Sequence, residues 1–476
     1  IFNPEKAWSG YTVFEGFQTG SVLVDMNGNV LRLWNDLQGF PVKMLPGGFV
    51  MASLGVRNPN FGLMDHTDLV QVDWEGNVVW KFNRYEFVED PGEEGMWMAR
   101  MHHDFQREGN PVGYYAPGLE PMVDGGNTLI LGHKELTNPK ISDKPLLDDV
   151  IYEINWEGDI LWEWTCSDHF EEMNFSEAAK NAMYRDPTMV IGDGKLGDWM
   201  HMNSASTLGP NRWYDNGDSR FHPDNIIWSG RQTNIIAITE KSSGKIVWQI
   251  GPDYASSAAL RKMGCIIGQH HAHMIPKGLP GEGNILVFDN GGVAGYGNPN
   301  PGAPTGHNNA IRDYSRVIEF DPVTLDRIWQ YSYIEANHIP MMSTFKFYSP
   351  LISSAQRLLN GNTMITEGVG GRIFEITPEH ETVWEYVSPY IGPHNAANLV
   401  YRAYRVPYDW IPQLEKPEEI EIAPVDNSRF RVPGSEWKPE QGVIEVAGTT
   451  GFKKPQFCVM DLEKPFGHTP NKLSKK

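Results

Sequence analysis

The sequence predicts an all-β fold: a six-bladed β-propeller closed by strands from both termini, with loop and short-helix insertions on one face. Two types of hairpin alternate six times along the chain. Glycine (48) and proline (34) are both frequent, which favours many short strands joined by turns. Four strands per repeat, repeated six times, is the pattern of a six-bladed propeller.

The first hairpin type is an apolar alternation, a turn of Asn, Gly, Asp, Ser or Pro, and a second alternation that ends in Trp. Such period-2 patterns predict pairs of antiparallel strands with one buried face. We assign these hairpins to the two outer strands of each blade and expect their tryptophans to fill the gaps between neighbouring blades. They occupy residues 22–34, 69–80, 150–162, 234–248, 316–329 and 372–384.

The second hairpin type lies between copies of the first, and we assign it to the two inner strands. Its six copies begin at residues 42, 102, 201, 270, 353 and 394. A Trp hairpin comes first in the chain and an inner hairpin comes last, so one blade needs strands from both ends. The first residues of each inner hairpin then lie where the chain enters the central channel.

Long insertions fall in the connections that lead from a Trp hairpin to an inner strand, at residues 81–101, 165–199, 249–268 and 330–352. These connections emerge on one face, where insertions usually build a pocket. Residues 176–184 predict a short helix on that face. We place the propeller in residues 1–412 and a C-terminal extension in 413–476, packing on the propeller or on a neighbouring subunit.

The charge balance excludes some partners. With 40 Lys and Arg against 60 Asp and Glu, the formal charge is −20, which disfavours nucleic acid and anionic membrane surfaces. No apolar run approaches the roughly 18 residues of a membrane helix, so we expect no membrane span. The chain starts at Ile1 without Met, so we expect a processed N-terminus from which a signal peptide has been removed.

Four histidines mark the start of inner hairpins. Alignment of the apolar alternation places His103, His201, His270 and His394 at equivalent positions facing the channel. A single such histidine usually caps a strand or bonds a neighbouring carbonyl. Several polar rings in one funnel would be costly without a function, so as a set they predict a site. Neighbouring His271 and His273 are weaker candidates for the site. By alternation, one points away from the axis and the other lies deeper in the channel, on the same face of the strand.

Two chemistries suit these residues, and spacing does not choose between them. His103, His201, His270 and His394 could bind a transition metal such as Fe, Cu or Zn. Alternatively, one imidazole is a nucleophile, and the others act with an arginine as acid, base and anion clamp.

Several motifs resemble the bacterial arylsulfate sulfotransferase family over about residues 10–410. They are "DWMHMNS" (198–204), "GQHHA" (268–272), "GNILVFDNG" (283–291), "RDYSRVIEFDP" (312–322), "AQRLLNGNTMITEG" (355–368), "GRIFEITP" (371–378) and "VYRAYRVP" (400–407). The resemblance implies a six-bladed propeller, generally exported to the periplasm or exterior. Its implied activity moves a sulfuryl group between phenols without a nucleotide donor and requires no cofactor.

The resemblance also assigns residues. The family's catalytic histidine falls on His270, preceded by Gln269, and a second family histidine falls on His201. The pattern Ser-Arg-His-Gln becomes Ser-Gly-Arg-Gln at 229–232, so Arg231 remains while Gln232 stands in place of a histidine. Glutamine can donate a hydrogen bond to a sulfuryl oxygen, but it cannot carry a proton or a positive charge at neutral pH.

The working hypothesis is a double displacement on a small aromatic substrate. His270 attacks the sulfur and becomes an N-sulfohistidine, Arg231 and His201 hold the sulfuryl oxygens, and His103 acts as acid and base. Substrate contacts are expected from Gln232, Asn203, Gln269 and His394. Arg231 could instead form an ion pair between blades. A metalloenzyme with a histidine ring and a non-catalytic binding propeller are the alternative functions, and a homo-oligomer is left open.

Overall fold

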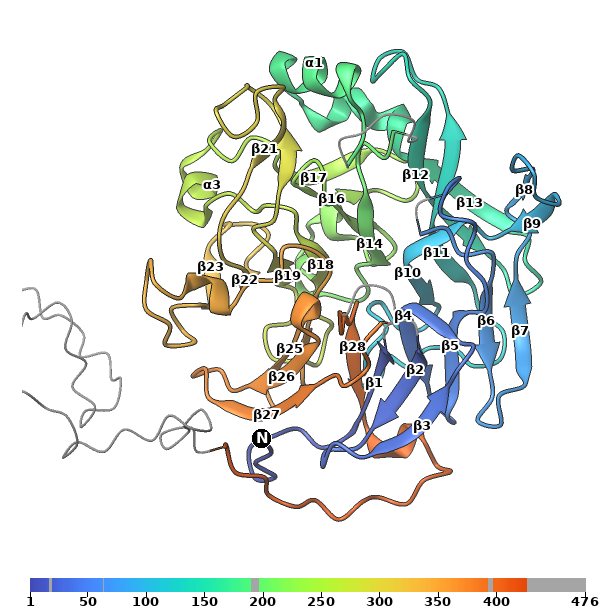
Figure 1. The fold of residues 1–476 in the computed structure, drawn as a ribbon, viewed down its shortest axis with the longest axis vertical. Helices are drawn as coiled ribbons and strands as arrows, with labels where there is room; N and C mark the ends of the chain where they lie inside the picture. The colour runs from blue at the N-terminus through green and yellow to red at the C-terminus, as the bar shows by residue number, and fades with distance from the viewer. Residues whose placement is uncertain (17–18, 63, 190–196, 393–396, 426–476) are drawn as a thin grey trace, which may run out of the picture. The chain divides into compact units, whose positions relative to one another are not determined.

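The structure is a computed structural model that describes residues 1–476 except 17–18, 63, 190–196, 393–396 and 426–476. Residues 1–423 form one compact unit. In its described part, six four-stranded antiparallel sheets surround a central axis (Figure 1). The predicted six-bladed propeller is therefore confirmed.

Each blade runs from an innermost strand beside the axis outward to a fourth strand. Blade 1 contains β28 (Ala403–Val406), β1 (Tyr11–Gly16), β2 (Gly20–Val24) and β3 (Val30–Trp34). Blade 2 contains β4 (Gln38–Leu45), β5 (Phe49–Ser53), β6 (Leu69–Val72) and β7 (Val78–Phe82). Blade 3 contains β10 (Met101–Arg107), β11 (Thr128–Leu136), β12 (Leu146–Ile154) and β13 (Ile160–Thr165).

The other three blades follow the same order. Blade 4 contains β14 (Met202–Thr207), β15 (Ile226–Gly230), β16 (Ile235–Thr239) and β17 (Ile246–Ile250). Blade 5 contains β18 (His270–Met274), β19 (Ile285–Asp289), β22 (Arg316–Phe320) and β23 (Arg327–Ser332). Blade 6 contains β24 (Ser354–Arg357), β25 (Thr363–Glu367), β26 (Arg372–Ile376) and β27 (Thr382–Val387).

Both ends of the chain complete blade 1, as the order of hairpins predicts. Strand β28 pairs antiparallel with β1, with Tyr11 opposite Val406 and Phe14 opposite Ala403. This pairing closes the ring, because it joins the last strand of the propeller to the first. Beyond β28, Phe2 and Ile422 exchange backbone hydrogen bonds of 2.9 Å.

Each Trp hairpin contacts the next blade, which confirms the predicted role of the tryptophans. The indole N–H groups of Trp80, Trp162, Trp248, Trp329 and Trp384 donate to backbone carbonyls in the outer turn of the following blade. Trp34 packs on Trp74, with 5.8 Å between ring centroids. The repeated residue thus holds neighbouring blades together by packing and by a hydrogen bond.

Insertions follow the outer strands. The hairpin β8 (Glu86–Val88) and β9 (Met96–Met98) leads to blade 3, and η1 (Cys166–Met173) with α1 (Glu177–Arg185) leads to blade 4. Helix α1 confirms the predicted short helix, and its Ser176 side chain accepts the N–H of Ala179 as a cap. The remaining elements are α2 (Arg212–Asp215), η2 (Ser219–Phe221), α3 (Ala258–Met263), β20 (Ala294–Tyr296), β21 (His307–Ala310), η3 (Thr344–Lys346), η4 (Gly368–Gly370) and η5 (Tyr408–Trp410).

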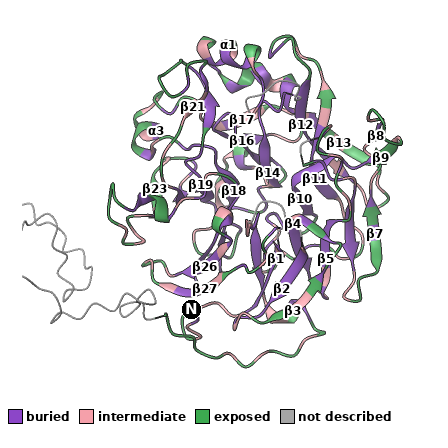
Figure 2. Ribbon diagram, in the orientation of Figure 1, coloured by how far each residue is buried: buried purple, intermediate pink, exposed green. Residues whose placement is uncertain are grey.

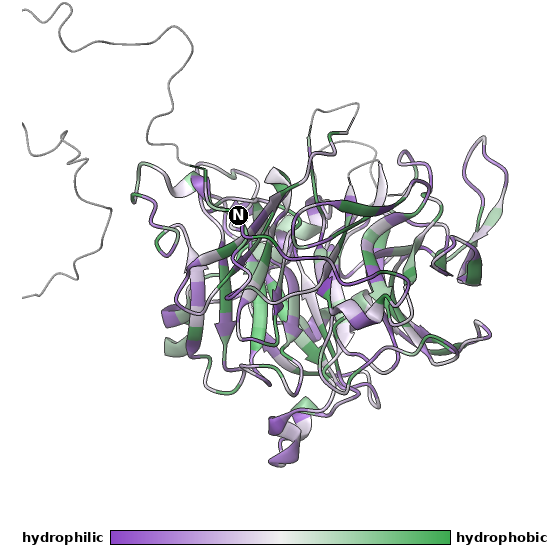
Figure 3. Cartoon of the chain, turned by 90° about the horizontal axis from the view of Figure 1, so that it is seen from below, coloured by the Kyte–Doolittle hydropathy of each residue, from purple (hydrophilic) through white to green (hydrophobic). Residues whose placement is uncertain are grey.

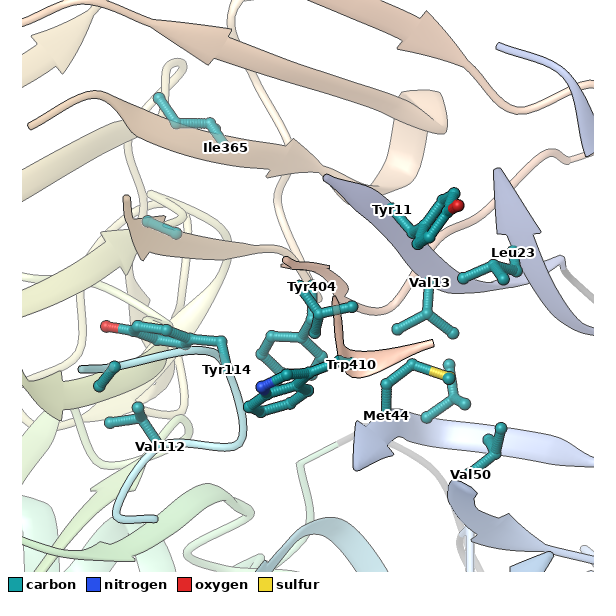
Figure 4. Packing of buried hydrophobic residues seen from close by; sticks show 14 of the residues in the cluster. Tyr11, Val13, Leu23, Met44, Val50, Val112, Tyr114, Ile365, Tyr404 and Trp410 are labelled. Carbon is teal, nitrogen blue, oxygen red and sulfur yellow. The ribbon is translucent and has the colours of Figure 1, made fainter. Parts of the chain in front are cut away.

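Apolar side chains fill the space between blades. Figure 4 shows Tyr11, Val13 and Met44 packing toward Tyr404 and Trp410 between blades 1 and 2. Inner strands such as β14 and β18 are buried almost throughout, whereas the outermost strands β7 and β13 are largely exposed or half-buried (Figure 2). Hydrophobic and hydrophilic stretches accordingly interleave along the strands (Figure 3). None of the helices described here is long and apolar enough to cross a bilayer.

Candidate active site

The innermost strands of blades 3, 4 and 5 begin with β-bulges that redirect histidine side chains. His103, His201 and His271 have left-handed backbones with φ of 57°, 52° and 52°. A bulge with such a residue interrupts the alternation of a strand and re-aims its side chains. In blade 5 the left-handed residue is His271 rather than His270, and the rings of His271 and His273 lie only 4.4 Å apart. Simple alternation therefore does not describe this strand.

His103 and His201 meet near the axis. Their ring centroids are 4.6 Å apart, edge to face, and both residues are at least 97% buried. The Nδ1–H of His201 donates to Oδ2 of Asp198 at 2.6 Å, so Nε2 is the nitrogen left for reaction. Nδ1 of His103 lies 2.8 Å from Nδ1 of His102, so one of these two rings donates to the other. Burial and the nearby His201 lower the pKa of His103 well below its ordinary value.

The tautomer of His270 follows from its hydrogen bonds. Nδ1 of His270 lies 2.8 Å from Oδ1 of Asn290. The Nδ2 amide of Asn290 donates to the carbonyls of Ser349 and Ile352, both at 2.7 Å, so its Oδ1 is fixed as an acceptor. Nδ1 of His270 is therefore the donor, and Nε2 carries a lone pair.

Arg231 is a buried cation beside His270. Arg231 is only 9% exposed. No carboxylate of the described residues lies within ion-pair distance of its guanidinium. The alternative of an ion pair between blades is therefore not observed for the residues that the structure describes. Its Nη1 group donates to Oε1 of Gln232 at 3.5 Å, and Gln232 Nε2 donates to Oδ1 of Asn308 at 2.8 Å. Gln232 thus supports Arg231.

Electrostatics connect Arg231 to His270. Burial lowers the pKa of His270 well below its ordinary value, and the positive charge of Arg231 lowers it further. His270 is consequently a neutral imidazole at pH 7. Burial also lowers the pKa of Arg231 to about 10, which still leaves the guanidinium charged.

Asn203 and Gln269 hold the backbone of the site together. Asn203 Nδ2 donates to the carbonyl of Gln269 at 2.7 Å. Gln269 Nε2 donates to blade 4 at Ser229 Oγ, at the Gly230 carbonyl and at the Ile235 carbonyl. These amide groups are occupied by the protein, while Asn203 Oδ1 and Gln269 Oε1 are buried without a hydrogen-bond partner. His394, the other predicted substrate contact, lies outside the described residues.

The channel is filled below the histidines. Asp104 accepts Lys43 Nζ at 2.7 Å and Arg402 Nη1 at 3.0 Å, and all three side chains are buried. Tyr114 donates to His273 Nε2 at 2.9 Å, because Nδ1 of that ring already donates to the His271 carbonyl. This paired layer forms the floor of the site.

Several residues of the site are not predicted by the sequence patterns. Asn290 follows β19 in "VFDNG", which is typical of a strand end and turn. Phe40 stacks on Tyr401 at 3.8 Å and meets His103 edge to face at 4.9 Å. Tyr348, from the insertion before β24, lies close enough to Arg231 for each to shift the pKa of the other.

Comparison with known proteins assigns the family. The model of the arylsulfotransferase (ASST) family matches residues 121–388, more than half of the chain. The chain belongs to this family. Among curated proteins no sequence matches it.

Solved structures with a similar fold have low sequence identity to this chain. A protein of unknown function from Bacteroides caccae is 10% identical with a TM-score of 0.44, covering 84% of this chain and 99% of that one. Apo AztD from Citrobacter koseri is 8% identical with a TM-score of 0.35, covering 84% and 98%. Virginiamycin B lyase from Staphylococcus aureus is 12% identical with a TM-score of 0.31, covering 75% and 71%.

Membership of the arylsulfotransferase family supports an aryl sulfotransferase activity in general terms and makes the protein a transferase. In the structure the rings of His103 and His201 are in contact, and His201 and Arg231 lie close enough to His270 to lower its pKa. Their roles in catalysis stay a prediction. A metal site on His103, His201, His270 and His394 stays a prediction. In the described chain, three metal-ligand atoms gather instead on His102, His133 and Asp149.

Proposed function

We propose that this arylsulfotransferase transfers a sulfuryl group from an aryl sulfate to a phenol through a covalent intermediate on Nε2 of His270. The observation that carries the proposal is the hydrogen bond from His270 Nδ1 to Asn290 Oδ1 at 2.8 Å. Because it holds the proton on Nδ1, it leaves the Nε2 lone pair as the nucleophile. The lowered pKa of His270 keeps this lone pair available at neutral pH.

Arg231 supports an anionic substrate. A buried charge without a partner is costly, and the sulfate ester supplies the missing negative charge. As the sulfur is attacked, negative charge on its oxygens stays next to a guanidinium that is already oriented by Gln232. Preorganised donors of this kind lower the barrier because they need no rearrangement during the reaction.

The two half-reactions balance. In the first, Nε2 of His270 forms a bond to sulfur, and the S–O bond to the ring breaks with its electron pair leaving on the phenolate. His201, in place of the predicted His103, gives a proton from Nε2 to this oxygen, because its Nδ1 is held by Asp198. In the second, His201 takes the proton of the acceptor phenol, whose oxygen bonds to sulfur while the N–S electron pair returns to His270. Asp198 stabilises the imidazolium of His201 in both.

The test is the mass of the intact protein after incubation with 4-nitrophenyl sulfate and no acceptor. We expect a gain of one SO3 group per chain, located on His270 by fragmentation and released when phenol is added. His270→Gln should show no gain, whereas His222→Gln, at an exposed histidine, should behave as the unmodified chain does.

Two results would overturn the proposal. One is a sulfuryl group on another residue, or an equal gain in His270→Gln. The other is steady-state kinetics that require donor and acceptor to be bound together, with no covalent species at any donor concentration.

A further inference from the structure

Three neighbouring strands of blade 3 direct side chains to one point. His102 comes from β10, His133 from β11 and Asp149 from β12, which lie side by side in Figure 1. His133 and Asp149 are direct partners in the antiparallel register, so their side chains lie on the same face. Nε2 of His102 is 3.1 Å, and Nε2 of His133 is 3.9 Å, from Oδ1 of Asp149. This histidine–aspartate cluster stands on rigid strands rather than on loops.

The converging atoms form no hydrogen bond of good geometry, although His102 Nε2 lies 3.1 Å from Asp149 Oδ1. His102 Nε2, His133 Nε2 and Asp149 Oδ1 are all buried and unpaired, and the three side chains are fully buried. Each unpaired polar atom in the interior costs about 1–3 kcal/mol. Three such atoms aimed at one point therefore indicate a ligand that binds all of them.

The opposite atoms of the same side chains are occupied. Nδ1 of His133 donates to Oδ1 of Asp65 at 2.5 Å, and Nδ1 of His102 lies 2.8 Å from Nδ1 of His103. Oδ2 of Asp149 accepts the backbone N–H of Met202 at 3.0 Å. A carboxylate on the far nitrogen of a histidine is the usual support of a metal-ligating imidazole, because it fixes the ring and its tautomer.

The distances fit a metal ion. Two ligand atoms at 2.0–2.1 Å from a tetrahedral ion are about 3.3 Å apart. The separations of 3.1 and 3.9 Å lie on either side of this value. The rings of His102 and His133 are stacked, with 3.6 Å between centroids and 15° between planes, so both rings must turn for their Nε2 lone pairs to meet at one ion. The charge also fits, because Asp149 has no Lys or Arg within ion-pair distance among the described residues.

One further carboxylate lies near the cluster. Asp198 interacts electrostatically with Asp149, and its Oδ1 is buried without a hydrogen-bond partner. A bound cation would balance the charge of both carboxylates.

We propose that His102, His133 and Asp149 bind one divalent transition-metal ion through two imidazole nitrogens and one carboxylate oxygen. This donor set is that of Zn²⁺ and of non-haem Fe²⁺. The ion would sit beside the sulfuryl-transfer site rather than in it. With Nε2 of His102 on the ion, the proton of that ring is on Nδ1 and donates to His103, so His103 presents its own N–H on Nε2. The ion thus fixes the tautomer of a residue in the active site.

The test is metal content and metal binding by the full chain. Elemental analysis of the purified protein distinguishes Zn²⁺ from Fe²⁺. After dialysis against a chelator, Zn²⁺ binding is followed by calorimetry and Co²⁺ binding by visible absorption. We expect one ion per chain and Co²⁺ bands typical of mixed nitrogen and oxygen ligands.

Variants separate this site from the predicted ring of histidines. Asp149→Asn should weaken Zn²⁺ binding more than about 100-fold. Asp65→Asn removes the carboxylate behind His133, and also a partner of Arg57 and Arg100, and should weaken Zn²⁺ binding by about 10–100-fold. His201→Gln and His270→Gln should bind Zn²⁺ like the unmodified chain. Circular dichroism of each metal-free variant shows whether it folds. If Asp149→Asn does not fold, the test is made with Asp65→Asn.

The proposal fails if the purified protein holds no metal and binds neither Zn²⁺ nor Co²⁺ at micromolar concentration. It also fails if Asp149→Asn and Asp65→Asn, both folded, bind as tightly as the unmodified chain. Loss of binding in His270→Gln with full binding in Asp149→Asn would place the ion on the ring instead.

Discussion

Two buried arginines lie near His270 and differ in their partners. Arg402, in the floor of the channel, donates to Asp104 at 3.0 Å, and Lys43 shares the same carboxylate. Arg231 has no carboxylate within ion-pair distance in the described chain. Their pKa values move in opposite directions: burial lowers that of Arg231 to about 10, whereas for Arg402 the effect of burial is outweighed by Asp104 and the pKa rises.

The difference shows which buried charge belongs to the fold and which to the reaction. Removing one partner of a buried pair leaves an uncompensated charge, so the floor is a structural unit. A buried guanidinium that the fold leaves unpaired is available to an anionic ligand. The same rule sets the histidines apart, since His273 is hydrogen-bonded at both nitrogens whereas His270 uses Nδ1 alone.

The largest expected effect is on the floor. Asp104→Asn leaves Lys43 and Arg402 buried without a negative charge, and we expect a loss of about 3–5 kcal/mol in the free energy of unfolding. Urea denaturation of the purified variant measures it. Arg231→Met is the matched control, with an expected change below about 1 kcal/mol. Equal losses in the two variants would remove the distinction between the arginines.

Arg231→Met should instead affect turnover. We expect kcat/KM for an aryl sulfate to fall by about 10²–10³-fold, because a preorganised charge next to the sulfuryl oxygens is lost. Arg231→Lys should recover part of the activity, since it keeps the charge but not the planar fork. Steady-state assays with 4-nitrophenyl sulfate measure both, and activity of Arg231→Met within twofold of the unmodified chain would contradict the assignment.

Much of this arrangement follows from repeated patterns in the sequence. The hairpins with a terminal Trp repeat often enough to predict the blades, their order and the closure by β28 and β1. His103, His201 and His270 stand at the starts of inner strands, so the propeller alone brings them together. Arg231 and Gln232 could be assigned through the family resemblance. Export to the periplasm or exterior stays a prediction.

Other features depend on geometry that no local pattern encodes. The bulge that redirects His271 arises from the pairing register of β18 and β19. Asn290 gains its role only because its amide is held by two carbonyls from the insertion before β24. His133 and Asp149 belong to different strands, although two adjacent carboxylates in the otherwise apolar "LLDDVIYEI" (146–154) are a signal that could have been used.

Inorganic sulfate should distinguish the two arginines by ligand binding. At about ten times its dissociation constant, sulfate stabilises the folded chain by about 1.4 kcal/mol if it binds only the folded state. We expect this gain in the unmodified protein and none in Arg231→Met. Thermal unfolding with sulfate, against chloride at equal ionic strength, measures it. An equal gain in both proteins would show that sulfate acts through its general salt effect and not through Arg231.

The smallest expected effect concerns pH. The reactive form of His270 is neutral, so activity is full above the pKa of the folded protein and is lost as pH falls through it. Burial, Arg231, His201 and Arg402 all lower this pKa, which places the acidic limb of kcat/KM below about pH 6.5. The free energy of unfolding also decreases as the pH falls below about 6.5, because the unfolded chain then binds a proton at His270 that the folded chain does not bind. In Arg231→Met one of these lowering charges is absent, so the residual activity should show its acidic limb at higher pH. Arg231 acts on the pKa of His270 more strongly than Arg402, which is paired with Asp104. An unchanged limb in the variant would mean that the charge of Arg231 does not set the ionisation of His270.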